Sequence, residues 1–304
     1  MKASRMNAID RRQFLKLTGA TVVAGSAAPL HTVGAGTASK RPLKKAVNLG
    51  MVTISGSTPE KFQLLKEIGF EGVELNRPGE PPAEEILKAR DASALPIAGI
   101  MNSVHWKLPL SDPDPAVRAQ SLDGLRNALR DAKAFGAPSV LLVPAVVTKQ
   151  VSYDDAWTRS QAEIRKVIPL AEELGVSIAI ENVGNFFLLS PLEAARYVDS
   201  FQSPAVRWHF DVGNSVRYGW PEQWIRILGK RIVNVHIKES VRPKAGDAGN
   251  RPRVELLEGD CDWPAVMKAF DDVGYRGWAI AEVPGGDATR LKFLAERMDR
   301  IFAS

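Results

Sequence analysis

From residue 44 onward, short apolar runs alternate with longer segments in which apolar and polar residues are mixed. Short apolar runs bounded by glycine, proline or polar residues are typical of strands buried in a parallel sheet. Eight runs fit this description: KAVNLGMV (45–52), FEGVELN (70–76), PIAGIMNS (96–103), PSVLLVPA (138–145), VSIAIEN (176–182), VRWHFDVG (206–213), RIVNVHIK (231–238) and GWAIAEV (277–283). The pattern therefore predicts eight buried strands.

Between the predicted strands, apolar residues recur three and four positions apart, which is the period of a helix with one buried face. Segments 58–70, 114–136 and 156–175 show this period, and a glycine closes several such segments. One face of the second segment carries Leu122, Leu125, Leu129, Ala132 and Phe135. Eight strands, each followed by a helix, predict a (β/α)8 TIM barrel, an α/β fold.

An open, doubly wound sheet is the alternative architecture. Such a sheet often has a glycine-rich phosphate-binding turn after its first strand. The segment NLGMVTISGS contains glycines but no G-x-G-x-x-G motif, which favours the barrel. The longest connection, residues 239–260, follows the seventh predicted strand, and connections of that length are usually functional or disordered.

Residues 1–38 have a different pattern, and we expect them to be separate from one barrel domain over residues 39–304. The segment DRRQFLK (Asp10–Lys16) holds paired arginines and precedes the weakly apolar LTGATVVAGSAAP. This order resembles a bacterial twin-arginine export signal. The apolar stretch is shorter than the roughly 20 residues that span a bilayer comfortably. An amphipathic N-terminal helix with chance arginines is the alternative interpretation.

Small residues at VGAGTA (Val33–Ala38) offer cleavage sites after Ala35 or Ala38. We therefore expect the twin-arginine export machinery to carry the folded chain to the periplasm. Cys261 is the only cysteine, so no intrachain disulfide can form in that oxidising compartment. We interpret Cys261 as a small apolar residue.

The charge of the chain is concentrated at its N-terminus. The formal net charge is +5, of which residues 1–38 contribute +4, leaving +1 for the predicted barrel. A nearly neutral domain lacks the electrostatic footprint of a nucleic-acid-binding protein. The composition, with 45% hydrophobic and 25% charged residues, is that of an ordinary soluble globular protein.

Four side chains that can bind metals stand at the ends of the last four predicted strands. They are Glu181, Asp211, His236 and Glu282. In a TIM barrel, catalytic groups come from the C-terminal ends of the strands. Strand alternation also places His209 on the same face as the sixth-strand carboxylate. Each of the four alone has a structural interpretation, as a helix cap or a core histidine, but together they predict one site.

Three carboxylates that converge in a low-dielectric site repel one another unless a cation is present. A divalent metal resolves this repulsion. Mostly oxygen ligands with one imidazole suit Mn²⁺ best, with Mg²⁺ or Co²⁺ as alternatives and Zn²⁺ less favoured.

The order Glu–Asp–His–Glu resembles the sugar phosphate isomerase/epimerase superfamily, which has the xylose isomerase-like barrel and includes D-tagatose/D-psicose 3-epimerases. The resemblance covers roughly residues 44–302. It also rests on SVHWKLPLSDPD, IAIENV, FDVGN, VHIKE and EGDCDWPAVMKAFDDVGYRGWAIAEVPGGD. These motifs are specific for the superfamily but not for a substrate. Members are often dimers or tetramers, so the resemblance allows a homo-oligomer.

The resemblance implies that Glu181, Asp211, His236 and Glu282 hold one metal. That metal would chelate two adjacent oxygens of an α-hydroxyketone and stabilise the enediolate. Glu181 and Glu282 would lie on opposite faces of this intermediate, so that one removes a proton and the other returns it. The chain is thus expected to be a sugar isomerase or epimerase that acts on a ketose or keto-sugar.

Several further residues match substrate contacts of the family or flank the predicted site. Arg242, six residues after His236, matches the arginine that binds substrate oxygens in the 3-epimerases. Lys238 is expected to stabilise the enediolate or an anionic substrate, or else to be a solvated lysine. His105 and Trp106 are expected to form a pocket wall, with a structural role for His105 as the alternative.

Glu74 is expected either to contact the substrate or to cap a helix. Two positions depart from the epimerases of free ketoses. Asn214 stands where those enzymes have a histidine, and Phe187 stands where they have a glutamate. Both positions are substrate contacts in those enzymes, so the resemblance predicts the metal site better than the specificity.

Three other functions are alternatives. A lyase or dehydratase on the same scaffold would eliminate a leaving group from a keto-sugar, inosose or oxidised glycoside. A periplasmic sugar-binding protein without catalysis is disfavoured, because all four ligand positions are intact. An apurinic endonuclease needs a three-metal site with more histidines than His105, His209 and His236 supply. Export favours an unphosphorylated sugar, because phosphorylated sugars are mainly cytoplasmic.

Overall fold

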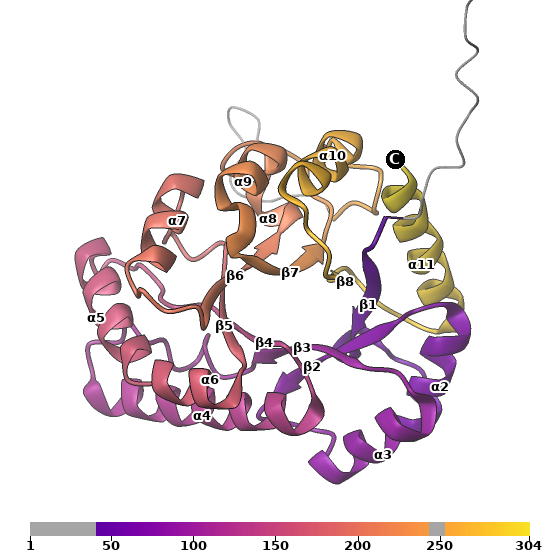
Figure 1. The fold of residues 1–304 in the computed structure, drawn as a ribbon, viewed down its shortest axis with the longest axis horizontal. Helices are drawn as coiled ribbons and strands as arrows, with labels where there is room; N and C mark the ends of the chain where they lie inside the picture. The colour runs from indigo at the N-terminus through magenta and orange to yellow at the C-terminus, as the bar shows by residue number, and fades with distance from the viewer. Residues whose placement is uncertain (1–40, 243–252) are drawn as a thin grey trace, which may run out of the picture. The chain divides into compact units, whose positions relative to one another are not determined.

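The computed structural model describes residues 41–242 and 253–304. Eight parallel strands close into a barrel in chain order, from β1 to β8, which confirms the predicted TIM barrel (Figure 1). The strands are β1 (Lys44–Asn48), β2 (Gly72–Arg77), β3 (Ile97–Asn102), β4 (Ser139–Leu142), β5 (Ser177–Glu181), β6 (Val206–Asp211), β7 (Ile232–Ile237) and β8 (Trp278–Ala281). The predicted export signal and its cleavage sites lie outside the described residues.

Helices surround the barrel in Figure 1. They are α2 (Thr58–Ile68), α3 (Ala83–Ser93), α4 (Pro115–Phe135), α5 (Tyr153–Arg165), α6 (Ile168–Leu174), α7 (Pro191–Asp199), α8 (Val212–Ser215), α9 (Pro221–Leu228), α10 (Trp263–Val273) and α11 (Ala288–Ala303), with the 3-10 turns η1 (Leu49–Met51) and η2 (Gly229–Arg231). All five residues of the apolar face predicted for α4 are buried. Among the residues described, no helix combines the length and apolarity needed to cross a membrane.

The helix predicted over residues 156–175 is in fact two helices. α5 ends at Arg165 and α6 begins at Ile168, with Pro169 in its first turn. Proline is compatible with the start of a helix but lacks the N–H that a helix interior needs. The apolar period of the sequence therefore continues although the helix is interrupted between residues 165 and 168.

The parallel pairing of β5 to β8 brings their C-terminal ends to the same mouth of the barrel. Asp211 on β6 pairs with His236 on β7, and His236 pairs with Ile280 on β8. On β6, Trp208 packs in the main hydrophobic core, while the ring of His209 lies 4.0 Å from that of His236. The predicted alternation along β6 is thus confirmed, and strand geometry alone brings these side chains together.

Candidate metal centre and substrate pocket

Glu181, Asp211, His236 and Glu282 converge at the C-terminal mouth of the barrel. One ligand atom from each lies within 4.8 Å of every other. The Nδ1 atom of His236 is 3.5 Å from Oε1 of Glu181, 3.5 Å from Oε2 of Glu282 and 4.0 Å from Oδ2 of Asp211. The structure therefore brings together the four residues that the sequence analysis selected as metal ligands.

Two atoms of this cluster are buried without a hydrogen bond from any described residue, namely Nδ1 of His236 and Oδ2 of Asp211, although the latter lies 3.4 Å from Nζ of Lys238. Both side chains are fully buried. An unsatisfied buried polar atom is destabilising by roughly 1–3 kcal/mol, so such atoms usually have a partner. A divalent cation bound by carboxylate oxygens and one imidazole would satisfy both atoms. The residues present fit a metal centre.

The carboxylates of the cluster differ in their tendency to ionise. Burial raises the pKa of Glu181 to about 7 and that of Asp211 to about 6. Burial also opposes ionisation of Glu282, but the positive charges of His236 and Lys238 outweigh it and hold the pKa of this carboxyl well below its usual range. Two carboxyl groups with separated pKa values are the arrangement that general acid and base pairs require.

Asn182 fixes the position of Asp211, a role that the sequence analysis missed. Its Nδ2 donates to the carbonyl oxygen of Asp211 at 2.8 Å, and its Oδ1 accepts from the Asp211 N–H at 3.0 Å. Asp211 Oδ1 accepts in turn from the N–H of Asn214 at 2.7 Å. The only sequence signal was that Asn182 directly follows Glu181 in the motif IAIENV.

The glycine of FDVGN is needed for close packing beside the centre. A Cβ atom added to Gly213 would lie 2.8 Å from the carbonyl oxygen of Lys238, which is too close for a real contact. Glycine therefore lets the start of α8 approach the end of β7. This approach holds the backbone of Lys238 next to the metal ligands.

The expected substrate contact of Glu74 is wrong in the structure. Its side chain is 0% exposed, because β2 continues to Arg77 and leaves Glu74 below the mouth of the barrel. Its Oε2 accepts from Asn48 Nδ2 at 2.8 Å and lies 3.2 Å from Nε2 of His236. Glu74 thus lies behind a metal ligand and does not face the pocket.

His105 is buried, and its Nδ1 accepts a hydrogen bond from the Val143 N–H at 3.3 Å. Burial lowers its pKa to about 4, so the ring is neutral. This contact fits the structural alternative for His105, and its pocket-wall role stays a prediction. Trp106 lies edge-on to it, with ring centroids 5.5 Å apart, and is half exposed. A substrate contact of Trp106 stays a prediction.

A pocket of about 580 Å³ lies beside the metal cluster. Asn214, Lys238 and Glu282 line it, as the sequence analysis expected for three site residues. Residues that follow β1 and β8, including Met51 and Gly285, and residues of the connection after β7 also line the pocket and were not predicted. The volume is that of an ordinary small-molecule site.

Arg242 and Phe187 lie elsewhere. The Arg242 guanidinium stacks on the ring of Trp220 at 4.6 Å and donates to the Gly219 carbonyl oxygen, and it is not among the residues that line the pocket. Its contact with substrate oxygens stays a prediction. Phe187 is buried against the rings of Tyr153 and Tyr197, so this position offers no polar group to a ligand.

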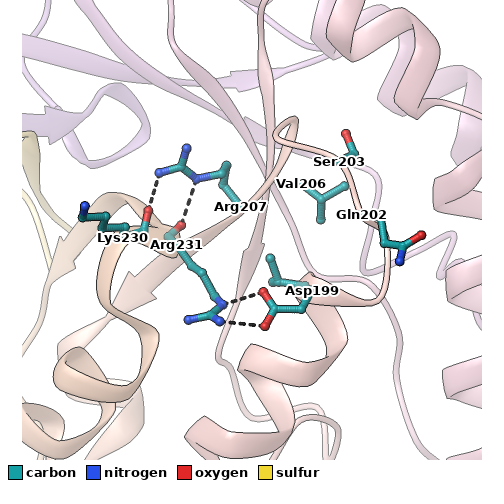
Figure 2. A pocket seen from close by; sticks show the side chains of 8 residues that line it. Asp199, Gln202, Ser203, Val206, Arg207, Lys230 and Arg231 are labelled. Carbon is teal, nitrogen blue, oxygen red and sulfur yellow. Dashed lines mark hydrogen bonds and ion pairs between the residues drawn. The ribbon is translucent and has the colours of Figure 1, made fainter.

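A second pocket, of about 540 Å³, lies at the opposite end of the barrel, where β6 and β7 begin (Figure 2). Its arginines are engaged with protein groups. Arg231 pairs with Asp199 at 2.6 Å, and Arg207 donates to the carbonyl oxygens of Lys230 and Arg231. The active sites of TIM-barrel enzymes lie at the C-terminal face of the barrel, which is the other end. We therefore interpret these contacts as structural links between α7, β6 and β7.

Comparison with known proteins gives the same architecture. Residues 62–301 match the family model described as a xylose isomerase-like TIM barrel. The L-ribulose-5-phosphate 3-epimerase UlaE of Escherichia coli O1:K1 / APEC is 25% identical over 239 residues, which cover 74% of this chain and 81% of that protein.

Two solved structures resemble this one in fold. A D-tagatose 3-epimerase-like protein superposes with a TM-score of 0.72 and 19% identity, covering 85% of this chain and 98% of that chain. The 3-keto-D-glucoside 4-epimerase YcjR from E. coli superposes with a TM-score of 0.70 and 16% identity, covering 86% of this chain and all of that chain.

Proposed function

The chain belongs to the xylose isomerase-like TIM-barrel family, and on this premise we propose that it is a divalent-metal-dependent sugar epimerase or isomerase. The observation that carries the proposal is the convergence of three carboxylates on Nδ1 of His236. UlaE and YcjR, named above, are sugar epimerases, which supports the same class of reaction. The substrate would be a ketose or keto-sugar with a hydroxyl group next to its carbonyl.

Glu181, Asp211, His236 and Glu282 would hold the metal, with Mn²⁺ as the first choice for this donor set. A bound divalent cation polarises a carbonyl oxygen and stabilises the negative charge that forms when the neighbouring C–H loses its proton. The four ligands lie on barrel strands or, for Glu282, directly after one. A rigid frame of this kind keeps the ligands preorganised.

Glu181 and Glu282 are the proposed acid–base pair. They come from β5 and from the residue after β8, with β6 and β7 between them, so they approach the centre from different sides. In one direction of reaction, the ionised Glu282 removes the proton from the carbon next to the carbonyl. Glu181, on the other side of the centre, would return a proton to the other face. Proton return from the opposite face inverts the carbon.

Lys238 and Asn214 are proposed to bind substrate oxygens. Both line the pocket next to Glu282, and Lys238 Nζ lies 3.4 Å from Oδ2 of Asp211. An ammonium group at this position favours negative charge that develops on a substrate oxygen. The amide of Asn214 offers a neutral hydrogen-bonding group where epimerases of free ketoses have histidine.

We further propose that the chain is exported by the twin-arginine route and acts on an unphosphorylated sugar in the periplasm. The paired arginines of Asp10–Lys16 and the small residues of Val33–Ala38 support this location. The named substrate of UlaE is phosphorylated, so location and substrate class would separate this chain from that relative.

The test is incubation of the purified, Mn²⁺-loaded protein with keto-sugars in D₂O. Deuterium at the carbon next to the carbonyl, in a sugar with one inverted centre or a moved carbonyl, is the expected result. Loss of water or of an aglycone would assign the chain to the lyases, for which the relatives named here give no support. Absence of any exchange over a broad panel of phosphorylated and free sugars would overturn the proposal.

A further inference from the structure

His236 makes its second polar contact on the side that faces away from the carboxylate cluster. Its Nε2 lies 3.2 Å from Oε2 and 3.3 Å from Oε1 of Glu74. Both side chains are 0% exposed. The imidazole is thus held between one carboxylate on β2 and three carboxylates at the mouth of the barrel.

Neighbouring side chains restrict both partners of this contact. Asn48 on β1 donates from Nδ2 to Oε2 of Glu74 at 2.8 Å, which holds the carboxylate against the barrel wall. The ring of His209 packs on that of His236, with centroids 4.0 Å apart and an interplanar angle of 66°. Rotation of the His236 ring would break the contact with Glu74 and disturb this packing. The orientation of the ring is therefore determined by buried neighbours.

A carboxylate accepts hydrogen bonds, so the nitrogen that faces Glu74 must carry a proton. In a neutral imidazole the other nitrogen then has the free lone pair, and in His236 that atom is Nδ1, which faces Glu181, Asp211 and Glu282. We propose that Glu74 is a positioning residue that keeps His236 in the Nε2–H form, so that Nδ1 is the metal donor. The proposal rests on the metal centre proposed above, but not on the sugar chemistry.

The same region offers a rival arrangement. Ligand atoms of Glu74, His209 and His236 also lie within 4.8 Å of one another, and both nitrogens of His209 are buried without a hydrogen bond from the described residues. A second ion there would need the lone pair of His236 Nε2. That requirement is incompatible with an Nε2–H donor to Glu74, so the number of ions per chain discriminates between the two arrangements.

The first experiment uses the full chain with ¹⁵N-labelled histidine, loaded with Zn²⁺ or Cd²⁺ so that the sample is diamagnetic. We expect one ion per chain, a proton on Nε2 of His236, and a metal-shifted Nδ1 resonance. The signals are assigned by their loss in His236→Gln. A proton on Nδ1, or two bound ions per chain, would overturn the proposal.

The second experiment compares Mn²⁺ binding by Glu74→Gln with that of the unsubstituted chain, in competition with a chelating indicator and without any sugar. Loss of an outer carboxylate partner of a metal-binding histidine typically weakens metal binding about 10–100-fold, and we expect a loss in this range. Glu163→Gln is the matched control, because Glu163 is also a buried carboxylate but bonds Arg118 and Lys166. Its Kd for Mn²⁺ should not change.

Equal Mn²⁺ affinity of Glu74→Gln and the unsubstituted chain would contradict the proposal. If Glu74→Gln does not fold, the resonances of the unsubstituted chain still decide the protonated nitrogen. If no sugar is turned over but these binding results hold, the proposed function fails while the role of Glu74 stands.

Discussion

The ammonium nitrogen of Lys238 lies 2.6 Å from Oε2 of Glu282, just past the ends of β7 and β8. The two side chains are 33% and 22% exposed, whereas those of Asp211 and His236 are completely buried. Both members of the pair line the pocket. Lys238 and Glu282 are therefore the part of the candidate site that an incoming ligand meets first.

The first prediction concerns the charge of Lys238. Lys238→Met should lower kcat/KM for the keto-sugar by about 10²–10³-fold, because removal of a donor that stabilises developing negative charge has effects of this size. Lys230→Met, an exposed lysine of the opposite pocket, should leave kcat/KM unchanged. Full activity of a Mn²⁺-loaded Lys238→Met protein would remove Lys238 from the mechanism.

The second prediction separates the two proposed proton-transfer groups. With Mn²⁺ at saturation, Glu282→Gln and Glu181→Gln should each lose about 10²–10⁴-fold in epimerisation rate, the range expected for a general acid or base. Glu181→Gln retains Glu282, which can remove a proton and return it to the same face. It should therefore still exchange deuterium into substrate that is not inverted. Equal losses of exchange and inversion in this variant would argue against a two-residue mechanism.

The fold could be predicted because each buried parallel strand is visible as an apolar run, and each covering helix as a period of three and four. The interruption between α5 and α6 was not predicted, because Pro169 is compatible with the first turn of a helix. Local sequence shows which residues are apolar. It does not show where the backbone hydrogen bonds of one helix stop and those of the next begin.

The ligand set could be predicted because a side chain at the end of a barrel strand has few alternatives to the mouth of the barrel. The position of Glu74 below the mouth of the barrel could not be predicted, because it depends on where β2 ends and on a register shift between Val73 and Glu74. Arg242 and His105 follow strands in loops, where backbone conformation has no period in the sequence. The stacking of Arg242 on Trp220 and the hydrogen bond from Val143 to His105 are tertiary contacts, which the sequence pattern does not show.

The third prediction concerns Glu239, which anchors the segment before α10. This buried carboxylate accepts hydrogen bonds from the N–H groups of Leu257 and Cys261 and from the indole of Trp263, at 2.9, 3.1 and 2.8 Å. Glu239→Leu would leave these donors unpaired and should lower the free energy of unfolding by roughly 3 kcal/mol or more. Urea unfolding followed by circular dichroism measures the change. Full stability of the variant would show that the segment is held by other contacts.

The fourth prediction tests whether the pocket of Figure 2 is structural. Arg231 binds Asp199 through two nitrogen–oxygen contacts of 2.7 and 2.6 Å, between partly exposed side chains. Asp199→Ala should lower the free energy of unfolding by at most about 1 kcal/mol, because exposed ion pairs contribute little. The kcat/KM and the Mn²⁺ affinity should stay unchanged. A loss of activity without a loss of stability would instead point to a functional role of this pocket.

The fifth prediction is that Mn²⁺ binds more tightly as the pH rises from 5.5 to 8. Burial raises the pKa of Glu181 to about 7 and that of Asp211 to about 6, so both carboxyl groups largely hold protons at the lower pH. The metal can be bound only after these protons leave, and they are already gone at pH 8. His236 must lose a proton as well, because burial opposes its charge but the carboxylates around it outweigh burial and raise its pKa. The apparent affinity for Mn²⁺ should therefore be lower at pH 5.5 than at pH 8 by at least ~100-fold.

This fifth prediction can be checked in two independent ways. Calorimetric titration at pH 6, in buffers with different ionisation enthalpies, should show net proton release on Mn²⁺ binding. The rise in Tm caused by a fixed excess of Mn²⁺ should be larger at pH 8 than at pH 5.5, because the stabilisation by a ligand grows with its affinity. Chelation with EDTA at pH 8 should reverse the rise. An affinity that is constant over this range would mean that the carboxyl groups of the centre are ionised before the metal arrives.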